Sequence, residues 1–338
     1  MIKSKIASLL VGSLISVVCF WYAFRQVDLS SMVSAISRVG VAWVMLSVLA
    51  SLLSLVVRAV RWRFLLAVAT PVGARSLLSA TFIGFMANSL FPVRLGEVIR
   101  AWVLTRREQT SMPAALASIV VERLFDVIAA LTLFGLGLAA MPSLDGGAAN
   151  LLKKSGLAVL MLVAVVVAGL LAAACYRGEL LELAERWVGS NRPWMRKALG
   201  LMHRFLDGLC ALRSGWQGLA VFALSFLVWG VAIAAFYVMA EGFHLGLTPV
   251  QVTLVFVIVL FGVAVPSAPG FVGTFHGFCV AALVMVAGTE PTLAAAYATL
   301  LHGSQWIAVT VVGLTFYLMD PSMTWSSMST SASRGEGA

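Results

Sequence analysis

The sequence is poor in charged residues. Only 11% of its 338 residues are Asp, Glu, Lys or Arg, whereas soluble domains carry about 25%. Hydrophobic residues make up 61% of the chain. Because a soluble fold cannot bury that much apolar surface, the composition excludes a soluble domain and predicts that lipid surrounds most of the chain.

Motifs for nucleotide, metal or hydrolytic chemistry are also missing. The chain has no Walker loop, no Rossmann glycine signature, no HExxH helix and no GxSxG elbow, which are the short patterns that fix a phosphate, a zinc ion or a nucleophile. Its four cysteines form no CxxC pair, which argues against a disulfide framework and a zinc site; they are Cys19, Cys175, Cys210 and Cys279. We therefore predict no cofactor, no metal and no catalytic residue.

Long apolar runs are present instead. Six of them could cross about 30 Å of hydrocarbon, which takes roughly 20 helical residues; they are 6–24, 41–57, 114–140, 156–175, 218–240 and 292–318. No small-residue cleavage pattern follows the first run, so we expect a retained span and not a signal peptide. Two further stretches are interrupted: 76–91 by Asn88 and Pro92, and 250–288 by Pro266–Gly270. The sequence thus predicts an all-α, polytopic membrane helical bundle.

Lysine and arginine predict the orientation, because these residues stay on the cytoplasmic side. If both interrupted stretches dip into the membrane and return, the segments 1–5, 58–75, 93–126, 176–217 and the tail after Met319 are cytoplasmic, and they hold 19 of the 23 Lys and Arg residues. If 76–91 crossed fully, four arginines of 93–126 would face outward. We therefore expect about six full spans plus two re-entrant broken hairpins in the cell (inner) membrane, with both termini cytoplasmic. The count is eight spans if the second hairpin crosses.

This layout contains an internal repeat. Each half has two spans, a dip and a third span, and so crosses the membrane three times. Because three is an odd number, the second half is inverted relative to the first. Inverted repeats with broken helices are typical of secondary transporters, whose substrate lies near the midplane. The predicted units are a first repeat (1–140), the start (141–175) and remainder (218–320) of a second repeat, and a disordered Ser-rich tail (321–338). The basic segment 176–217 is either an amphipathic surface segment or a solvated linker.

The first interrupted stretch carries the first candidate site. Pro92 breaks the dipping helix, and a short helix then opens at Leu95 to Glu97, where free N–H groups favour an anion. Arg94 and Arg100 could hold a phosphate, and Glu97 could pair with either arginine or carry a proton. The alternative is an ordinary basic cytoplasmic loop.

A second candidate site lies inside the run 114–140. Glu122 and Asp126 are four residues apart and share a helix face, and Arg123 can reach Asp126. Charges at membrane depth are costly and usually face a cavity or a partner. The alternative is that these side chains extend to the cytoplasmic surface.

The second interrupted stretch mirrors the first on the outer side. A helix stops at Pro269 and Gly270, and a new one opens near Gly273 with His276 as the titratable group. A single histidine at this depth either takes part in transport or only packs between helices. The same choice applies to His302 and Gln305 in the last span.

With these motifs the sequence resembles the lysylphosphatidylglycerol synthase transmembrane-region family, a flippase-like membrane module. The resemblance covers roughly residues 5–320 and rests on Asn88 with Pro92-Val-Arg94-Leu-Gly96-Glu97-x2-Arg100, then Glu122-Arg123-Leu-Phe-Asp126, then Pro269-Gly270-x2-Gly273. It implies a lipid head-group and translocation site built from these motif residues. The chain departs from the family in having His276 where relatives commonly have Glu. It resembles a stand-alone member, because we identify no aminoacyl-transferase domain in it.

Three functions fit these features. The resemblance favours a flippase-like protein that moves a phospholipid or a polyprenyl- or hopanoid-type lipid between leaflets. Alternatives are a membrane scaffold subunit of a lipid-biosynthesis enzyme, docked through 176–217, and a lipid-modifying transferase with Glu122 or Asp126 as base. The expected partners are membrane lipids with an anionic or amphoteric head group and, in the scaffold case, a cytoplasmic enzyme, but not nucleic acid. A transporter is favoured over an enzyme because two carboxylates without a nucleotide or metal site make weak catalytic machinery.

Overall fold

The computed structural model describes residues 2–66, 72–91, 95–108, 110–141, 147–188, 200, 215–265 and 267–320. Within these ranges the chain forms helices and no β-strand, which confirms the predicted all-α fold. Five stretches of the described residues are long and apolar enough to cross a membrane: Val41–Leu66, Lys153–Leu170, Trp216–Gly242, Pro269–Ala287 and Pro291–Leu318. The protein is therefore a polytopic membrane protein.

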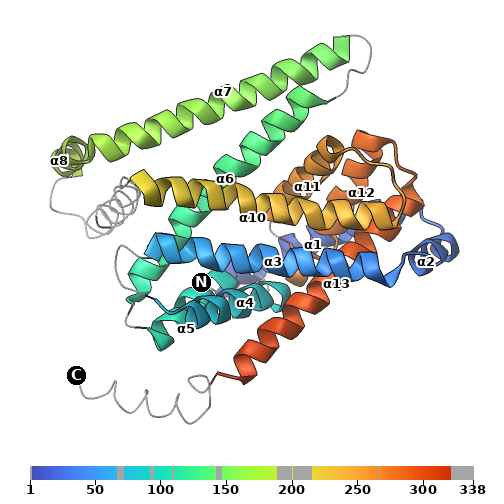
Figure 1. Cartoon of the computed structure of the whole chain (residues 1–338), viewed down its shortest axis with the longest axis horizontal. Coiled ribbons are helices and arrows are strands. Elements are labelled where there is room, and N and C mark those ends of the chain that lie inside the picture. The colour runs from blue at the N-terminus through green and yellow to red at the C-terminus, as the bar shows by residue number, and fades with distance from the viewer. Residues whose placement is uncertain are drawn as a thin grey trace.

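The helices follow the predicted runs closely. The first half contains α1 (Ile2–Phe24), α2 (Leu29–Ser37), α3 (Val41–Leu66), α4 (Ala74–Leu90), α5 (Gly96–Arg107) and α6 (Met112–Ala140). The second half contains α7 (Gly147–Cys175), α8 (Arg177–Val188), α10 (Gly215–Gly242), α11 (Pro249–Ala264), the 3-10 turn η2 (Pro269–Phe271), α12 (Thr274–Ala287) and α13 (Pro291–Leu318). Figure 1 shows α3 and α10 side by side across the middle of the molecule, with α7 projecting beyond them beside α6.

The end of α3 differs from the prediction. The expectation that 58–75 is a cytoplasmic segment is wrong at its start, because the helix continues to Leu66. Arg58 and Arg61 are therefore inside the bundle, with 4% and 0% of their surface exposed. The short helix α2 was not predicted either; Asp28 caps it by accepting hydrogen bonds from the backbone N–H groups of Ser30 and Ser31.

Both interrupted stretches form helical hairpins. In the first, α4 and α5 are antiparallel and Asn88 lies beside Gly96. In the second, α11 and α12 are antiparallel and Gly262 lies beside Phe278. α12 itself has 14 residues, but together with η2 it belongs to the stretch Pro269–Ala287, which is long and apolar enough to cross a membrane. Whether the two hairpins re-enter or cross therefore stays a prediction.

The two halves of the chain pack closely against each other. α3 and α10 are antiparallel, because Ser47 Oγ donates to the Ala235 carbonyl while Arg61 Nη1 donates to Ser225 Oγ. α4 packs against α13, and the second hairpin packs against α6 through α11 and against α13 through α12. Each hairpin thus contacts helices of both halves, and the internal repeat stays a prediction.

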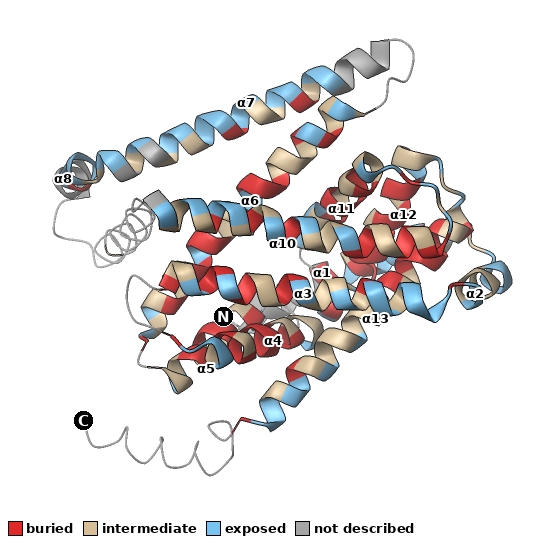
Figure 2. Ribbon diagram, viewed as in Figure 1, coloured by how far each residue is buried: buried red, intermediate tan, exposed pale blue. Residues whose placement is uncertain are grey.

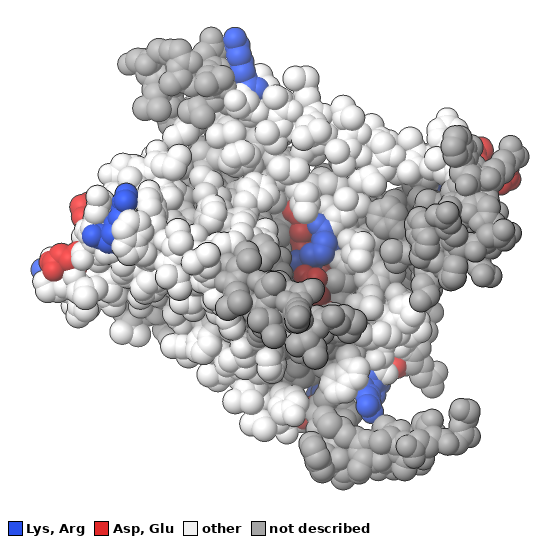
Figure 3. Space-filling view, turned by 180° about the vertical axis from the view of Figure 1, so that it is seen from behind, with Lys and Arg blue, Asp and Glu red and all other residues white. Residues whose placement is uncertain are grey.

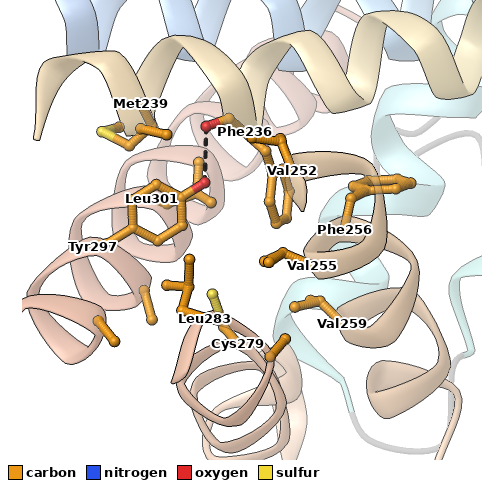
Figure 4. Close-up of a cluster of buried hydrophobic side chains, with 14 of the residues drawn as sticks. Phe236, Met239, Val252, Val255, Phe256, Val259, Cys279, Leu283, Tyr297 and Leu301 are labelled. Carbon is orange, nitrogen blue, oxygen red and sulfur yellow. Dashed lines mark hydrogen bonds between the residues drawn. The ribbon is translucent and has the colours of Figure 1, made fainter. Parts of the chain in front are cut away.

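Apolar packing fixes the second hairpin in place. Figure 4 shows side chains of α10, α11, α12 and α13 converging in one cluster, with the Tyr297 hydroxyl donating a 2.8 Å hydrogen bond to the Phe236 carbonyl. Figure 2 shows that buried residues concentrate in the hairpins and around α3 and α10, whereas α7 is largely exposed. The two hairpins are therefore part of a packed core, which positions the groups at their tips.

Candidate functional site

Charged side chains from three helices of the first half meet inside this core. Arg58 and Arg61 are three residues apart on α3, and Glu122 and Asp126 are four apart on α6, so each pair lies on one helix face. Arg100 of α5 completes the group. None of the five is more than 5% exposed, so these charges depend on one another for stabilisation.

Short ion pairs connect the members of this cluster. Arg58 Nη1 lies 3.2 Å from Glu122 Oε1 and 2.8 Å from Asp126 Oδ2, and Arg61 Nη1 lies 2.7 Å from Asp126 Oδ1. Arg100 Nη1 lies 3.0 Å from Glu122 Oε2, and Arg123 Nη2 lies 2.7 Å from Glu122 Oε1. Arg61 Nη2 lies 3.2 Å from Glu122 Oε1. Four arginines therefore surround the Glu122 carboxylate.

Tryptophan rings pack against two of the arginines. The guanidinium carbon of Arg100 lies 3.8 Å from the centre of the Trp62 ring, and that of Arg58 lies 5.0 Å from the centre of the Trp229 ring. Such contacts stabilise a cation that has lost its water. Because Trp229 belongs to α10, the second half of the chain also contributes to the site.

The tip of the first hairpin brings α5 against α4. Asn88 Oδ1 accepts a 2.8 Å hydrogen bond from the backbone N–H of Gly96 at the start of α5. A Cβ atom at Gly96 would overlap the carbonyl oxygen of Gly84, so only glycine permits this approach. Pro92 and Arg94, which the sequence places in the same turn, lie outside the described residues.

The tips of the two hairpins touch. The indole N–H of Trp306 on α13 donates a 3.1 Å hydrogen bond to the Ser89 carbonyl at the end of α4. Gly270, with a φ of +67°, lies so close that a Cβ atom there would be 2.9 Å from the same oxygen. Glu122 is ten residues into the 29-residue helix α6, or about 15 Å along it. Polar groups of both halves are thus brought together inside the helical bundle.

A cavity of about 310 Å³ lies between these tips and the charged cluster. Its lining includes Arg58, Arg100 and Arg123, together with Trp229 of α10 and His302 and Gln305 of α13. The arginines can bind an anion, and the three uncharged side chains offer hydrogen bonds.

The charges of the cluster are unbalanced. Glu97 is its third carboxylate, with Oε1 3.7 Å from Arg123 Nε, so four arginines meet three carboxylates and leave one positive charge in excess among the described residues. Arg58 Nε, Arg100 Nε and Arg100 Nη2 are buried and have no acceptor in this part of the chain. Buried charge and unpaired donors are costly without a counter-ion, so the arrangement suits an anion with oxygen acceptors. Across the same ranges, no three His, Cys, Asp or Glu side chains converge as a metal ion would require.

The cluster is partly open to the surroundings. The side chains of Glu97 and Arg123 are 34% and 36% exposed. Figure 3 shows acidic and basic side chains in a hollow near the centre of one face, whereas the other charges visible on that face lie near its edges. The charged site is therefore accessible from this face of the molecule.

The predicted site residues separate into two groups. Glu97, Arg100, Glu122, Arg123 and Asp126 form the cluster, Asn88 shapes the first tip, and Pro269 and Gly270 belong to the second tip. Gly273, with a φ of +93°, packs instead against the backbone of Ser16 on α1. The ring of His276 lies 5.1 Å from that of His302, which lines the cavity; His276 itself contacts α1.

Sequence reasoning missed several residues of the site, among them Arg58, Arg61, Trp62 and Trp229. Arg58 and Arg61 were assigned to a cytoplasmic segment. They are three residues apart within the stretch Leu55 to Trp62, so they would share one face of a longer helix, and this spacing was a usable signal. Trp229 lies in an apolar run and carries no local signal, because only its contact with Arg58 distinguishes it from other buried aromatic residues.

Comparison with known proteins gives one family and two relatives. The family described as "Lysylphosphatidylglycerol synthase TM region" matches residues 9–313. "Glycosyltransferase AglD" of Haloferax volcanii is 25% identical over 90% of this chain and 53% of its own length. "UPF0104 membrane protein" of Methanothermobacter thermautotrophicus is 24% identical over 78% of this chain and 80% of its own length. The chain thus spans about half the length of the first relative, and no solved structure matches it.

Proposed function

Because the chain belongs to the lysylphosphatidylglycerol synthase transmembrane-region family, we propose that it moves an anionic lipid between the two leaflets of the cell (inner) membrane. The observation that carries this proposal is the arginine-rich cluster, which has one positive charge in excess and is open on one face of the molecule. In the proposed arrangement this opening faces lipid near the middle of the membrane. A soluble anion would have to pass through hydrocarbon to reach such an opening. A phospholipid is already part of the bilayer that surrounds it.

The proposed mechanism follows from the residues that line the cavity. The phosphate of the head group binds Arg58, Arg100 and Arg123, because guanidinium groups donate paired hydrogen bonds to phosphate oxygens. The acyl or polyprenyl chains remain in the surrounding lipid. The touching hairpin tips at Ser89 and Gly270 separate the two sides of the membrane, and relative motion of the halves about the bound head group exposes it to the other leaflet. In this scheme both termini lie in the cytoplasm.

Reconstitution tests the proposal. The purified full chain is placed in liposomes that contain a fluorescent phospholipid, and the fraction that an external quencher can reach is followed over time. The wild-type protein should make inner-leaflet lipid accessible, and Arg100→Gln should slow this movement at least about tenfold, because the loss of one charge-assisted contact costs about 1.5–3 kcal/mol. Arg63→Gln on the exposed side of α3 is the matched control and should behave like wild type.

Other outcomes would contradict lipid movement. Equal rates for Arg100→Gln and wild type would remove the cluster from the mechanism, and no movement by the wild type would refute the flippase proposal. A new lipid species in extracts would instead favour a transferase. A partner enzyme that is lost when 176–217 is replaced by a Gly/Ser linker would favour a scaffold.

A further inference from the structure

A separate pocket of about 350 Å³ lies at the end of the first hairpin that is remote from its tip. It is formed where α4 begins, α5 ends and α13 ends, and its lining comprises Arg75, Arg107, Val312, Thr315, Phe316 and Met319. None of these six residues lines the cavity beside the charged cluster. The proposed lipid movement therefore gives this pocket no role.

One side of the pocket is basic. The Glu108 carboxylate accepts a 3.2 Å hydrogen bond from the Gly73 backbone N–H, which holds the end of α5 against the start of α4. This contact brings Arg75 and Arg107 to one pocket. Asp320 compensates Arg107, since its Oδ2 lies 2.6 Å from Arg107 Nη2. Arg75 is exposed and forms no ion pair with any residue that the structure describes, so its charge is free to bind an anion.

The other side of the pocket is apolar and belongs to α13. Val312, Phe316 and Met319 follow one another at spacings of four and three residues, so they share one face of this helix. Phe316 stacks on Phe82 of α4 with 5.5 Å between ring centres, whereas Met319 is 62% exposed. The hydroxyl of Thr315 already donates to the backbone of α13. The pocket thus suits a molecule with an anionic head and an apolar tail.

The pocket lies at a basic end of the membrane helices. Arg106 and Arg107 occupy the last turn of α5, and the guanidinium carbon of Arg106 lies 5.3 Å from the centre of the Trp102 ring. Tryptophan and arginine are typical of the boundary between hydrocarbon and water, and basic ends stay on the cytoplasmic side. Basic pockets between membrane helices on that side bind anionic head groups. A free phosphate ion would leave the apolar face of α13 uncovered, so a lipid fits better.

We propose that this pocket holds a phospholipid with an anionic head group from the cytoplasmic leaflet, as a resident lipid that is not transported. Its phosphate binds Arg75 and Arg107, because guanidinium groups donate paired hydrogen bonds to phosphate oxygens. One acyl chain lies along Val312 and Phe316. The bound lipid links the first hairpin to α13 and stabilises their contact, because a ligand of the folded state favours that state.

Protection of an introduced thiol tests the site locally. The full chain with Met319→Cys is purified in detergent and labelled with a water-soluble maleimide, and peptide mass spectrometry distinguishes this position from the native cysteines. Phosphatidylglycerol should slow the labelling at least about threefold, as expected when most of the pocket is occupied. Phosphatidylcholine with the same acyl chains should slow it much less, because its head group carries no net negative charge.

Variants at Arg75 separate a basic site from a merely apolar groove. In the Met319→Cys chain, Arg75→Gln should raise the phosphatidylglycerol concentration for half-maximal protection about fivefold, since one arginine is lost. Because Arg75 has no ion pair within the described ranges, this variant should keep the Tm of the parent. Arg75→Lys should restore most of the affinity. Arg63→Gln, at an exposed position of α3, is the matched control and should protect like the parent.

The position of the thiol provides a second control. Leu318→Cys, beside the pocket residue Met319 and 72% exposed, does not line the pocket and should be labelled equally fast with either lipid. Equal protection of Met319→Cys by phosphatidylcholine, or unchanged protection in Arg75→Gln, would overturn the site. Equal protection by glycerol 3-phosphate or inorganic phosphate would assign the pocket to a free phosphate and overturn the lipid. Absence of lipid movement in liposomes would refute only the function proposed above.

Discussion

Replacement of Glu122 by glutamine should destabilise the protein strongly. Glu122 is fully buried, and its carboxylate lies within 3.2 Å of four arginines. Glutamine keeps the shape but removes the charge, so the excess positive charge of the described cluster rises from one to two. Removal of one partner from a buried ion pair costs about 3–5 kcal/mol, because the other partner remains buried without compensation.

Thermal unfolding of the detergent-solubilised protein measures this loss. At roughly 2–4 °C per kcal/mol, the expected fall in Tm is roughly 6–20 °C. Tryptophan fluorescence is a suitable signal, since Trp62 and Trp229 contact the cluster. Glu179→Gln makes the same chemical change on the exposed surface of α8 and should lower Tm by no more than about 1 °C.

A compensating substitution distinguishes lost charge balance from lost packing. Arg61 pairs with both carboxylates but does not line the cavity, so Glu122→Gln combined with Arg61→Gln restores the original excess of one. The double variant should recover part of the fall in Tm, because interacting residues are not additive. Two results would refute the charge-balance reasoning. One is a Glu122→Gln protein with the same Tm as the Glu179→Gln control. The other is a double variant whose fall in Tm equals the sum of the falls in the two single variants.

Three further predictions address the hairpin, the end of α13 and α2. Gly96→Ala should lower Tm and stop lipid movement, because its Cβ would overlap the Gly84 carbonyl; Gly230→Ala, with nothing within 4 Å, should change neither. Asp320→Asn should increase thiol labelling of a cysteine at position 319, because the 2.6 Å ion pair with Arg107 is lost, and adding Arg107→Gln should cause little further increase. Hydrogen bonds from the Ser31 and Ser30 hydroxyl and backbone N–H groups lower the pKa of Asp28 below its usual 3.8, so its contribution to α2 is present at neutral pH and is lost as the pH falls through that lowered pKa. The protection of α2 amides against hydrogen exchange, corrected for the intrinsic rate at each pH, should therefore fall in acid, and Asp28→Asn should abolish this pH dependence.

Hydropathy and charge determined the membrane fold without reference to tertiary contacts. A chain that crosses lipid must satisfy its backbone hydrogen bonds within each helix, so spans appear as uninterrupted apolar runs. The predicted run 292–318 and helix α13 (Pro291–Leu318) differ by one residue at the start, and 114–140 ends where α6 ends. The breaks at Pro92 and Pro269 likewise predicted two hairpins, because proline interrupts a helix except in its first turn.

The same local rules misplaced the end of α3. The three arginines Arg58, Arg61 and Arg63 follow closely on the apolar run 41–57, so Arg58 was expected to begin a cytoplasmic segment. Its position inside the bundle depends on Asp126, which lies 68 residues away in the sequence and supplies the opposite charge at 2.8 Å. A hydropathy window of about 20 residues cannot contain both partners.

The sequence by itself therefore determined that the chain is an all-α, polytopic membrane protein and where most of its helices lie. Only the tertiary structure decided which charges neutralise one another, how many remain in excess, and that Trp229 of the second half lines the cavity of the first. The reason is physical: helix formation and transfer into lipid depend on neighbouring residues, whereas the energy of a buried charge depends on the groups that packing brings within a few ångströms of it.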